Sequence, residues 1–125
     1  MNVLIDSSGW IEYFSNGTKA SKFSEYIRKA AKKNHFVSTI VLYEVYKKIT
    51  REAGEQAANQ AVAHILDATQ VIALDERIAL HAAQTSIETG LAMGDAIIYA
   101  TARLHNARII TSDQHFKELP NTKII

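Results

Sequence analysis

The sequence predicts an α/β fold in which helices cover both faces of a central, mostly parallel sheet of four or five strands. The candidate strands are short apolar runs at 1–5, 35–38, 71–74 and 107–111, with 122–125 as a possible fifth. Segments with helical periodicity, a dozen or more residues long, separate most of these runs. Because parallel strands need crossovers of about that length, the alternation favours a parallel sheet.

The first half of the chain begins with the strand at 1–5, and Asp6 leads from it into a helix over about 8–15. Asn16-Gly17 is a helix stop, after which Thr18 can cap a second helix that reaches Lys33. We expect the apolar face of this second helix to carry Phe23, Tyr26, Ile27 and Ala30.

A third helix is expected over about 39–53, after the strand at 35–38, with Leu42, Val45, Tyr46 and Ile49 on its inward face. Gly54 breaks it, and a fourth helix over about 55–69 places inward Ala58, Ala61, Val62 and Ile65. The strand at 71–74 follows, and Asp75 is suited to cap a fifth helix that ends before Gly90.

The sixth helix opens at Gly94-Asp95 and is apolar nearly all round over 96–102, which is typical of a helix buried on most sides. At 125 residues, with 47% hydrophobic residues and one proline, we expect a single domain over residues 1–125. The apolar run at 1–5 is too short for a signal peptide or membrane anchor. The absence of cysteine excludes disulfides and thiolate sites and is compatible with a cytoplasmic protein.

Charge is distributed unevenly along the chain although the net charge is only +1. Residues 19–51 carry nine Lys or Arg against two Glu, which leaves the remainder strongly acidic. A basic face favours a polyanionic substrate such as RNA, because phosphate contacts dominate nucleic-acid affinity, although a solvated helix face is an equally plain interpretation. The residues of this stretch that we select as RNA-binding candidates are Lys47, Lys48 and Arg51.

In such a fold the functional residues lie just beyond the carboxyl ends of the strands, and the topology brings at least three of four candidate carboxylates to this edge. Asp6 follows the first strand, Asp113 lies two residues after the strand at 107–111, Glu44 lies just over one turn into the third helix, and Asp95 lies in the first turn of the sixth. Converging carboxylates repel each other unless a cation compensates them. All-oxygen ligands suit Mg²⁺ or Mn²⁺, which can support hydrolysis of a phosphodiester.

Each carboxylate also has a purely structural interpretation. Asp6 and Asp95 could cap helices, Asp113 could be a turn residue, and Glu44 could form ordinary salt bridges with lysines on its own helix. The histidines show no zinc-binding spacing, although His115 lies close enough to Asp113 to touch a substrate.

The residues quoted above resemble those of the PIN-domain ribonucleases, and above all the VapC-like toxins of toxin–antitoxin pairs. The likeness extends over the whole chain and rests on three motifs besides Glu44: Asp6-Ser7-Ser8, the run from Gly94 to Ala102, and the run from Thr111 to Phe116. It implies an α/β/α sandwich and Mg²⁺- or Mn²⁺-dependent cleavage of RNA. Asp6 and Asp95 would be the principal metal ligands, Glu44 and Asp113 would complete the pocket, and Ser7, Thr111 and Ser112 would supply hydroxyls.

The resemblance further implies a homodimer and a small antitoxin whose tail packs in a groove. Trp10 and Phe14 could line this groove, although a core role is the more ordinary interpretation for some of these apolar residues. A housekeeping RNA-processing nuclease and a catalytically silent RNA- or protein-binding module remain alternatives. Two other classes fit less well. A haloacid dehalogenase phosphatase needs a second Asp where this chain has Ser8, and a receiver domain needs an acidic pair after its first strand.

Overall fold

The computed structural model describes residues 1–125 and confirms the α/β class. Five strands form one sheet in the order β3-β2-β1-β4-β5, and every neighbouring pair is parallel. The strands are β1 (Asn2–Ile5), β2 (His35–Ser38), β3 (Gln70–Ile72), β4 (Ala107–Thr111) and β5 (Thr122–Ile124). The helices are α1 (Ser7–Phe14), α2 (Ala20–Ile27), α3 (Thr39–Ala53), α4 (Glu55–Ala68), α5 (Glu76–Thr89) and α6 (Met93–Leu104), with a short 3₁₀ helix η1 (Gln114–Phe116).

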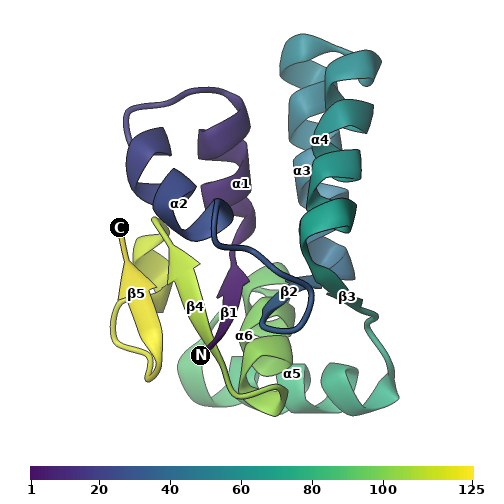
Figure 1. Cartoon of the computed structure of the whole chain (residues 1–125). Helices are drawn as coiled ribbons and strands as arrows, with labels where there is room; N and C mark the ends of the chain where they lie inside the picture. Colours follow the sequence, from purple (N-terminus) through teal and green to yellow (C-terminus); the bar gives the residue numbers. More distant parts are fainter.

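The strand order decides where the helices lie. From β1 the chain moves outward to β2 and β3, and it then crosses back to β4 on the other side of β1. Because such crossovers are right-handed, this reversal places α1–α4 on one face of the sheet and α5 and α6 on the other. In Figure 1 the far end of the α3–α4 hairpin stands out from the rest of the molecule, whereas α5 and α6 lie together at the other end of the picture.

The core explains why these segments hold their positions. A single cluster of 27 buried hydrophobic residues includes side chains of β1, β4, α3 and α6. In α3, Val41, Val45 and Ile49 recur every four residues and are buried, as a helix face turned toward a sheet requires. Residues 96–102 of α6 are buried without exception, which confirms the prediction of a helix buried on most sides. None of the helices has both the length and the apolar character needed to span a membrane.

The second helix was predicted too long. It runs from Ala20 to Ile27 with Lys19 as its N-cap, so Thr18 is not the cap and the helix does not reach Lys33. Phe23 and Ile27 are buried as expected, but no large apolar residue continues that face beyond Ile27. Residues 28–34 therefore form turns that bring the chain back to β2.

Smaller corrections concern β3 and α3. β3 ends at Ile72 instead of Leu74, because its partner strand β2 ends at Ser38, which pairs with Ile72. In α3 the inward position belongs to Val41 and not to Tyr46, which is 37% exposed. Asp75 does cap α5, accepting from the Ile78 N–H at 2.9 Å, and Gly90 ends that helix in the left-handed conformation.

Candidate functional site

The point where the chain reverses its direction across the sheet lies between β1 and β4. Ile5, the last residue of β1, pairs with Ile110, one residue before the end of β4, and the Asp6 N–H donates to the Ile110 carbonyl at 3.0 Å. Open α/β sheets bind their ligands in the crevice at such a reversal. Asp6 and Asp113 flank this crevice directly, as the sequence predicts.

Asp6 lies at the N-cap position of α1, yet its side chain makes no capping hydrogen bond. Its Oδ2 instead accepts from the Thr111 hydroxyl at 2.7 Å and from the Ser8 hydroxyl at 3.0 Å. The Ser7 hydroxyl lies 3.5 Å from Oδ1. The carboxylate is thus held in place by side chains from β4 and α1, and a capping role does not explain it.

Burial sets the electrostatic state of Asp6, which is 2% exposed. Desolvation raises the pKa of its carboxyl, and the charge of Asp113 adds to the rise, while the hydrogen bonds from Thr111, Ser8 and Ser7 act against it. No cation of the protein pairs with it. A buried carboxylate without a counter-charge is a physical reason to expect a bound cation.

Glu44 points into the same region from α3. Its Oε1 is buried without a hydrogen-bond partner. The start of α6 packs closely against it, since a Cβ added to Gly94 would lie only 3.4 Å from Glu44 Oε2. Burial raises the pKa of Glu44, the Ser7 hydroxyl acts against this rise, and the charges of Asp6, Asp95 and Asp113 add to it. The salt bridges proposed as its structural role do not form, since the only ion pair on this helix joins Lys48 to Glu52 at 3.0 Å.

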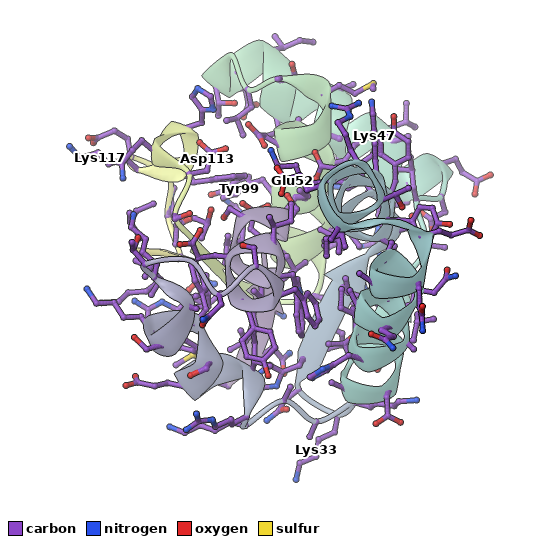
Figure 2. The ribbon with its side chains drawn as sticks, turned by 90° about the horizontal axis from the view of Figure 1, so that it is seen from above. Lys33, Lys47, Glu52, Tyr99, Asp113 and Lys117 are labelled. Atoms are coloured by element: carbon purple, nitrogen blue, oxygen red, sulfur yellow. The ribbon has the colours of Figure 1, made fainter.

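Asp95 and Asp113 complete the cluster, and Asp113 can be located in Figure 2. Asp95 is the third residue of α6, whose N-cap is Ala92, so Asp95 does not cap the helix. Burial raises the pKa of Asp95, and the charges of Asp113 and Asp6 raise it further. Asp113 does serve as a turn residue, because its Oδ1 accepts from the His115 N–H at 2.9 Å.

His115 is a stronger member of the site than its sequence position indicates. Its Nδ1 lies 3.0 Å from Asp113 Oδ1 and 3.5 Å from Asp95 Oδ2. One ligand atom from each of these three residues lies within 4.8 Å of the others, a grouping that could hold a metal ion. The signal was available in the sequence, since Asp-x-His after a strand puts both side chains at one turn, but α6 had to be placed beside that turn.

Only two of the three residues predicted to supply hydroxyls do so in the structure. The Thr111 and Ser7 hydroxyls lie at Asp6 as expected, whereas Ser112 participates through its backbone N–H, which donates to Ser8 Oγ at 3.1 Å. Ser8, the last residue of the Asp6-Ser7-Ser8 motif, thereby links α1 to the end of β4. The donor set of carboxylates, one imidazole and an unpartnered buried oxygen on Glu44 fits a divalent cation of the Mg²⁺ or Mn²⁺ kind.

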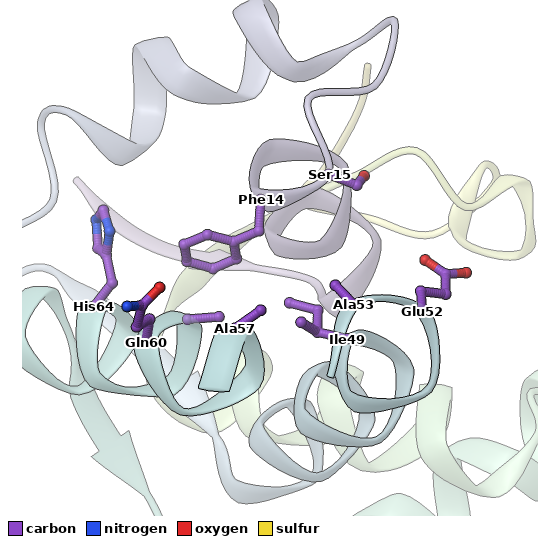
Figure 3. A pocket seen from close by; sticks show the side chains of 9 residues that line it. Phe14, Ser15, Ile49, Glu52, Ala53, Ala57, Gln60 and His64 are labelled. Carbon is purple, nitrogen blue, oxygen red and sulfur yellow. The ribbon is translucent and has the colours of Figure 1, made fainter. Parts of the chain in front are cut away.

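A separate apolar groove of about 350 Å³ lies between α1 and the α3–α4 hairpin (Figure 3). Phe14 borders it on one side, with Ile49 and Ala57 opposite and His64 at one end. Of the two roles open to Trp10 the structure shows the core role, because Trp10 is fully buried and stacks on Phe14 at a centroid distance of 6.0 Å, so it does not line the groove. Phe14 does line the groove as expected.

The raised pKa values make stability depend on pH in a defined direction. A carboxyl whose pKa is higher in the folded than in the unfolded protein stabilises the fold below its unfolded value, 3.8 for Asp and 4.5 for Glu, and this stabilisation is lost as pH rises through the folded value. We therefore expect the metal-free protein to lose stability as pH rises above about 4, and Mg²⁺ to restore it near neutral pH.

Thermal unfolding followed by circular dichroism between pH 4 and 8, in EDTA and in Mg²⁺, measures this effect. Asp6→Asn should flatten the pH dependence in EDTA and remove part of the Mg²⁺ stabilisation. Asp67→Asn, a change at an exposed position of α4, is the matched control. An identical pH profile for Asp6→Asn and the unaltered protein would contradict the electrostatic account of the site.

Known proteins resemble this chain in sequence and in fold. The family model described as PIN domain matches residues 3–121. No curated protein sequence matches the chain. Among solved structures, a toxin–antitoxin complex from Klebsiella pneumoniae is similar at 25% identity with a TM-score of 0.79, over 98% of this chain and 96% of that one.

Two further structures share the fold at lower identity. VapC20 of Mycobacterium tuberculosis, described as a toxin that cleaves the sarcin-ricin loop, has 18% identity and a TM-score of 0.79, with 96% of each chain covered. DNA-bound VapBC from Salmonella typhimurium has 17% identity and a TM-score of 0.79, over 100% of this chain and 97% of that one. The predicted VapC-like sandwich architecture is confirmed.

Proposed function

The chain belongs to the PIN domain family, and from this premise we propose that it is a ribonuclease that hydrolyses RNA phosphodiesters at a divalent-metal site. The observation that carries the proposal is the convergence of four carboxylates, from the β1–α1 junction, α3, α6 and the β4–η1 turn. Three of them have raised pKa values, and one has a buried, unpartnered oxygen. Such a cluster is electrostatically costly unless it holds a cation.

The residues of the site have different roles. Asp6 and Asp95 would be the principal ligands of Mg²⁺ or Mn²⁺, and Glu44 and Asp113 would complete the acidic pocket. Thr111 and Ser8 orient the Asp6 carboxylate through their hydroxyls. When bound, the cation supplies positive charge for the phosphodiester and its leaving oxygen and makes water a better nucleophile. The basic side chains of α3 would attract the RNA backbone.

We also assign to this protein the role of the toxin in a toxin–antitoxin pair. The Klebsiella pneumoniae relative is described as a toxin–antitoxin complex, and the Salmonella typhimurium relative as VapBC bound to DNA. The groove between α1 and the α3–α4 hairpin offers a place for the antitoxin, because its walls are mostly apolar while Glu52 and Gln60 stand at its border (Figure 3). An apolar groove rimmed by polar groups suits an amphipathic peptide segment.

A homodimer forms the last part of this proposal. Three large apolar side chains on or beside α5 are strongly exposed, Leu80 at 73%, Ile87 at 79% and Met93 at 75%. Leu80 and Ile87 lie seven residues apart and therefore share one face of α5, and an exposed apolar face is typical of protein–protein contacts. Sedimentation analysis of the purified protein would decide this point.

The test is incubation of the protein with total RNA in Mg²⁺, in Mn²⁺ and in EDTA, with mapping of the cleaved ends. We expect cleavage in either metal, none in EDTA, and suppression by a small protein encoded beside this one that co-purifies with it. Cleavage that no such partner suppresses would favour a housekeeping RNA-processing nuclease. Binding of RNA without cleavage in any divalent metal would refute the nuclease and favour a silent binding module.

A further inference from the structure

A second groove, distinct from the acidic cluster and from the groove beside Phe14, runs along the outer side of α3. It is shallow and open to solvent, with a volume of about 650 Å³. Its lining comes from α3 except for one α4 residue: Leu42, Tyr43, Tyr46, Lys47, Thr50, Arg51 and Val62. No part of the proposed metal chemistry uses it.

Two tyrosines give the groove aromatic surface that the core does not use. Tyr43 is 58% exposed and Tyr46 is 37% exposed, so both rings are accessible from solvent. Lys47 lies over the Tyr43 ring at 5.5 Å from its centroid and donates to the Tyr43 hydroxyl at 3.4 Å. The groove thus presents a flat π-surface next to a cation.

The cations of this helix are not equivalent. Lys48 is paired with Glu52 at 3.0 Å, whereas Lys47 and Arg51, which border the groove, form no ion pair with any carboxylate of the chain. Unpaired cations beside exposed aromatic rings match single-stranded nucleic acid in two ways, because phosphates contact the cations and bases stack on the rings. An apolar protein surface would complement the rings but would leave both cations buried without partners.

The groove also lies on a part of α3 that adjoins the acidic site. Tyr43, Lys47 and Thr50 follow at four- and three-residue steps and therefore share one face of the helix. Lys47 lies three residues after Glu44, so its face adjoins the one that carries the acidic site. A strand that passes Glu44 can continue into the groove without leaving the surface of this helix.

We propose that the groove of Tyr43, Tyr46, Lys47 and Arg51 binds a single-stranded segment of the RNA beside the cleavage site, with bases stacked on the tyrosines and phosphates on the two cations. The proposal deepens and rests on the ribonuclease function, for which it names single-stranded RNA as the form of substrate at this surface. It also assigns the phosphate contacts to Lys47 and Arg51 and not to Lys48, a distinction that the sequence analysis did not make.

The first test separates stacking from plain apolar contact. Tyr43→Leu keeps an apolar side chain but loses the ring, and Tyr43→Phe keeps the ring. We expect Tyr43→Leu to raise the KM for a single-stranded oligoribonucleotide on the order of 10-fold and Tyr43→Phe to leave it nearly unchanged. Hydrolysis of bis(p-nitrophenyl) phosphate, which is too small to reach the groove, should stay at the unaltered level in both variants. An unchanged oligonucleotide KM for Tyr43→Leu would overturn the inference while the nuclease stands.

The second test uses binding in an Asp95→Asn background, where we expect no cleavage. Lys47→Gln and Arg51→Gln together should reduce the slope of log K against log salt concentration by about 1.4, since each phosphate contact to a single strand contributes about 0.7. Lys33→Gln, on the opposite side of the molecule in Figure 2, is the matched control and should leave the slope unchanged.

Two outcomes identify the error if the inference is wrong. A Tyr43→Leu variant that changes from dimer to monomer and keeps its RNA affinity would show that the groove is a contact between copies of the chain. An unaltered slope in the Lys47 and Arg51 variant would exclude RNA from the groove. By contrast, RNA binding that depends on Tyr43 in a protein that cleaves no phosphodiester would refute the nuclease and leave the groove as an RNA site.

Discussion

Asp6→Asn and Asp95→Asn are each expected to reduce RNA cleavage in Mg²⁺ by at least about 10³-fold, because a metal ligand supplies several kcal/mol of transition-state stabilisation and each 1.36 kcal/mol is a factor of ten. Both substitutions preserve the shape of the side chain and remove its charge. Asp6 in particular retains an oxygen that can accept from the Thr111 hydroxyl, so the architecture at the end of β1 should survive.

Initial rates on a labelled RNA, together with Mg²⁺ binding measured by calorimetry, check this expectation. Loss of metal binding should accompany loss of cleavage, and the far-ultraviolet circular dichroism should be unchanged. Asp67→Asn serves again as the control for loss of a carboxylate outside the site. Full activity in both variants would mean that the acidic cluster does not carry the chemistry.

Trp10→Ala is expected to cost about 3–5 kcal/mol of unfolding free energy, the usual effect of removing a large aromatic side chain from a core. Trp10 is completely buried, stacks on Phe14 and meets the edge of His64 at 6.2 Å. It belongs to α1, the helix whose first turn contains Ser7 and Ser8. Loss of its packing should therefore loosen the support of the Asp6 carboxylate as well.

Urea unfolding of Trp10→Ala and Trp10→Phe provides the measurement. The Phe variant should lose much less, because an aromatic ring still packs there and the indole N–H, which is buried without a partner, is removed. Burial of an unpaired donor costs about 1–3 kcal/mol, which offsets part of the lost packing. Equal losses in the two variants would show that the ring does not pack as described.

Local patterns predicted most of the fold because each depends on neighbouring residues. The apolar runs that became β1, β2 and β4, the Asp75 cap and the Gly90 stop are all readable over a few positions. The errors have a different cause. α2 ends at Ile27 and β3 ends at Ile72 because of what packs or pairs beside them, and neither partner is visible in the local sequence.

The candidate site was predictable to a similar extent. The four carboxylates could be selected because parallel strands bring their carboxyl ends to one edge, but the nature of each contact could not be predicted. Asp6 proved to be held by the Thr111 hydroxyl, 105 residues away, and Lys48 by Glu52 instead of Glu44. His115 was placed near Asp113 by sequence alone and near Asp95 only by the packing of α6 against the end of β4.

By itself, therefore, the sequence determined the order of helices and strands and which acidic residues follow a strand or open a helix, since hydrophobic periodicity and capping act within one or two turns. Only the tertiary structure decided which oxygens are desolvated, that Glu44 faces the acidic site and leaves Lys48 to Glu52, and that Trp10 is core while Phe14 lines a groove. The physical reason is that burial and charge pairing depend on distances between segments, and the strand order sets those distances.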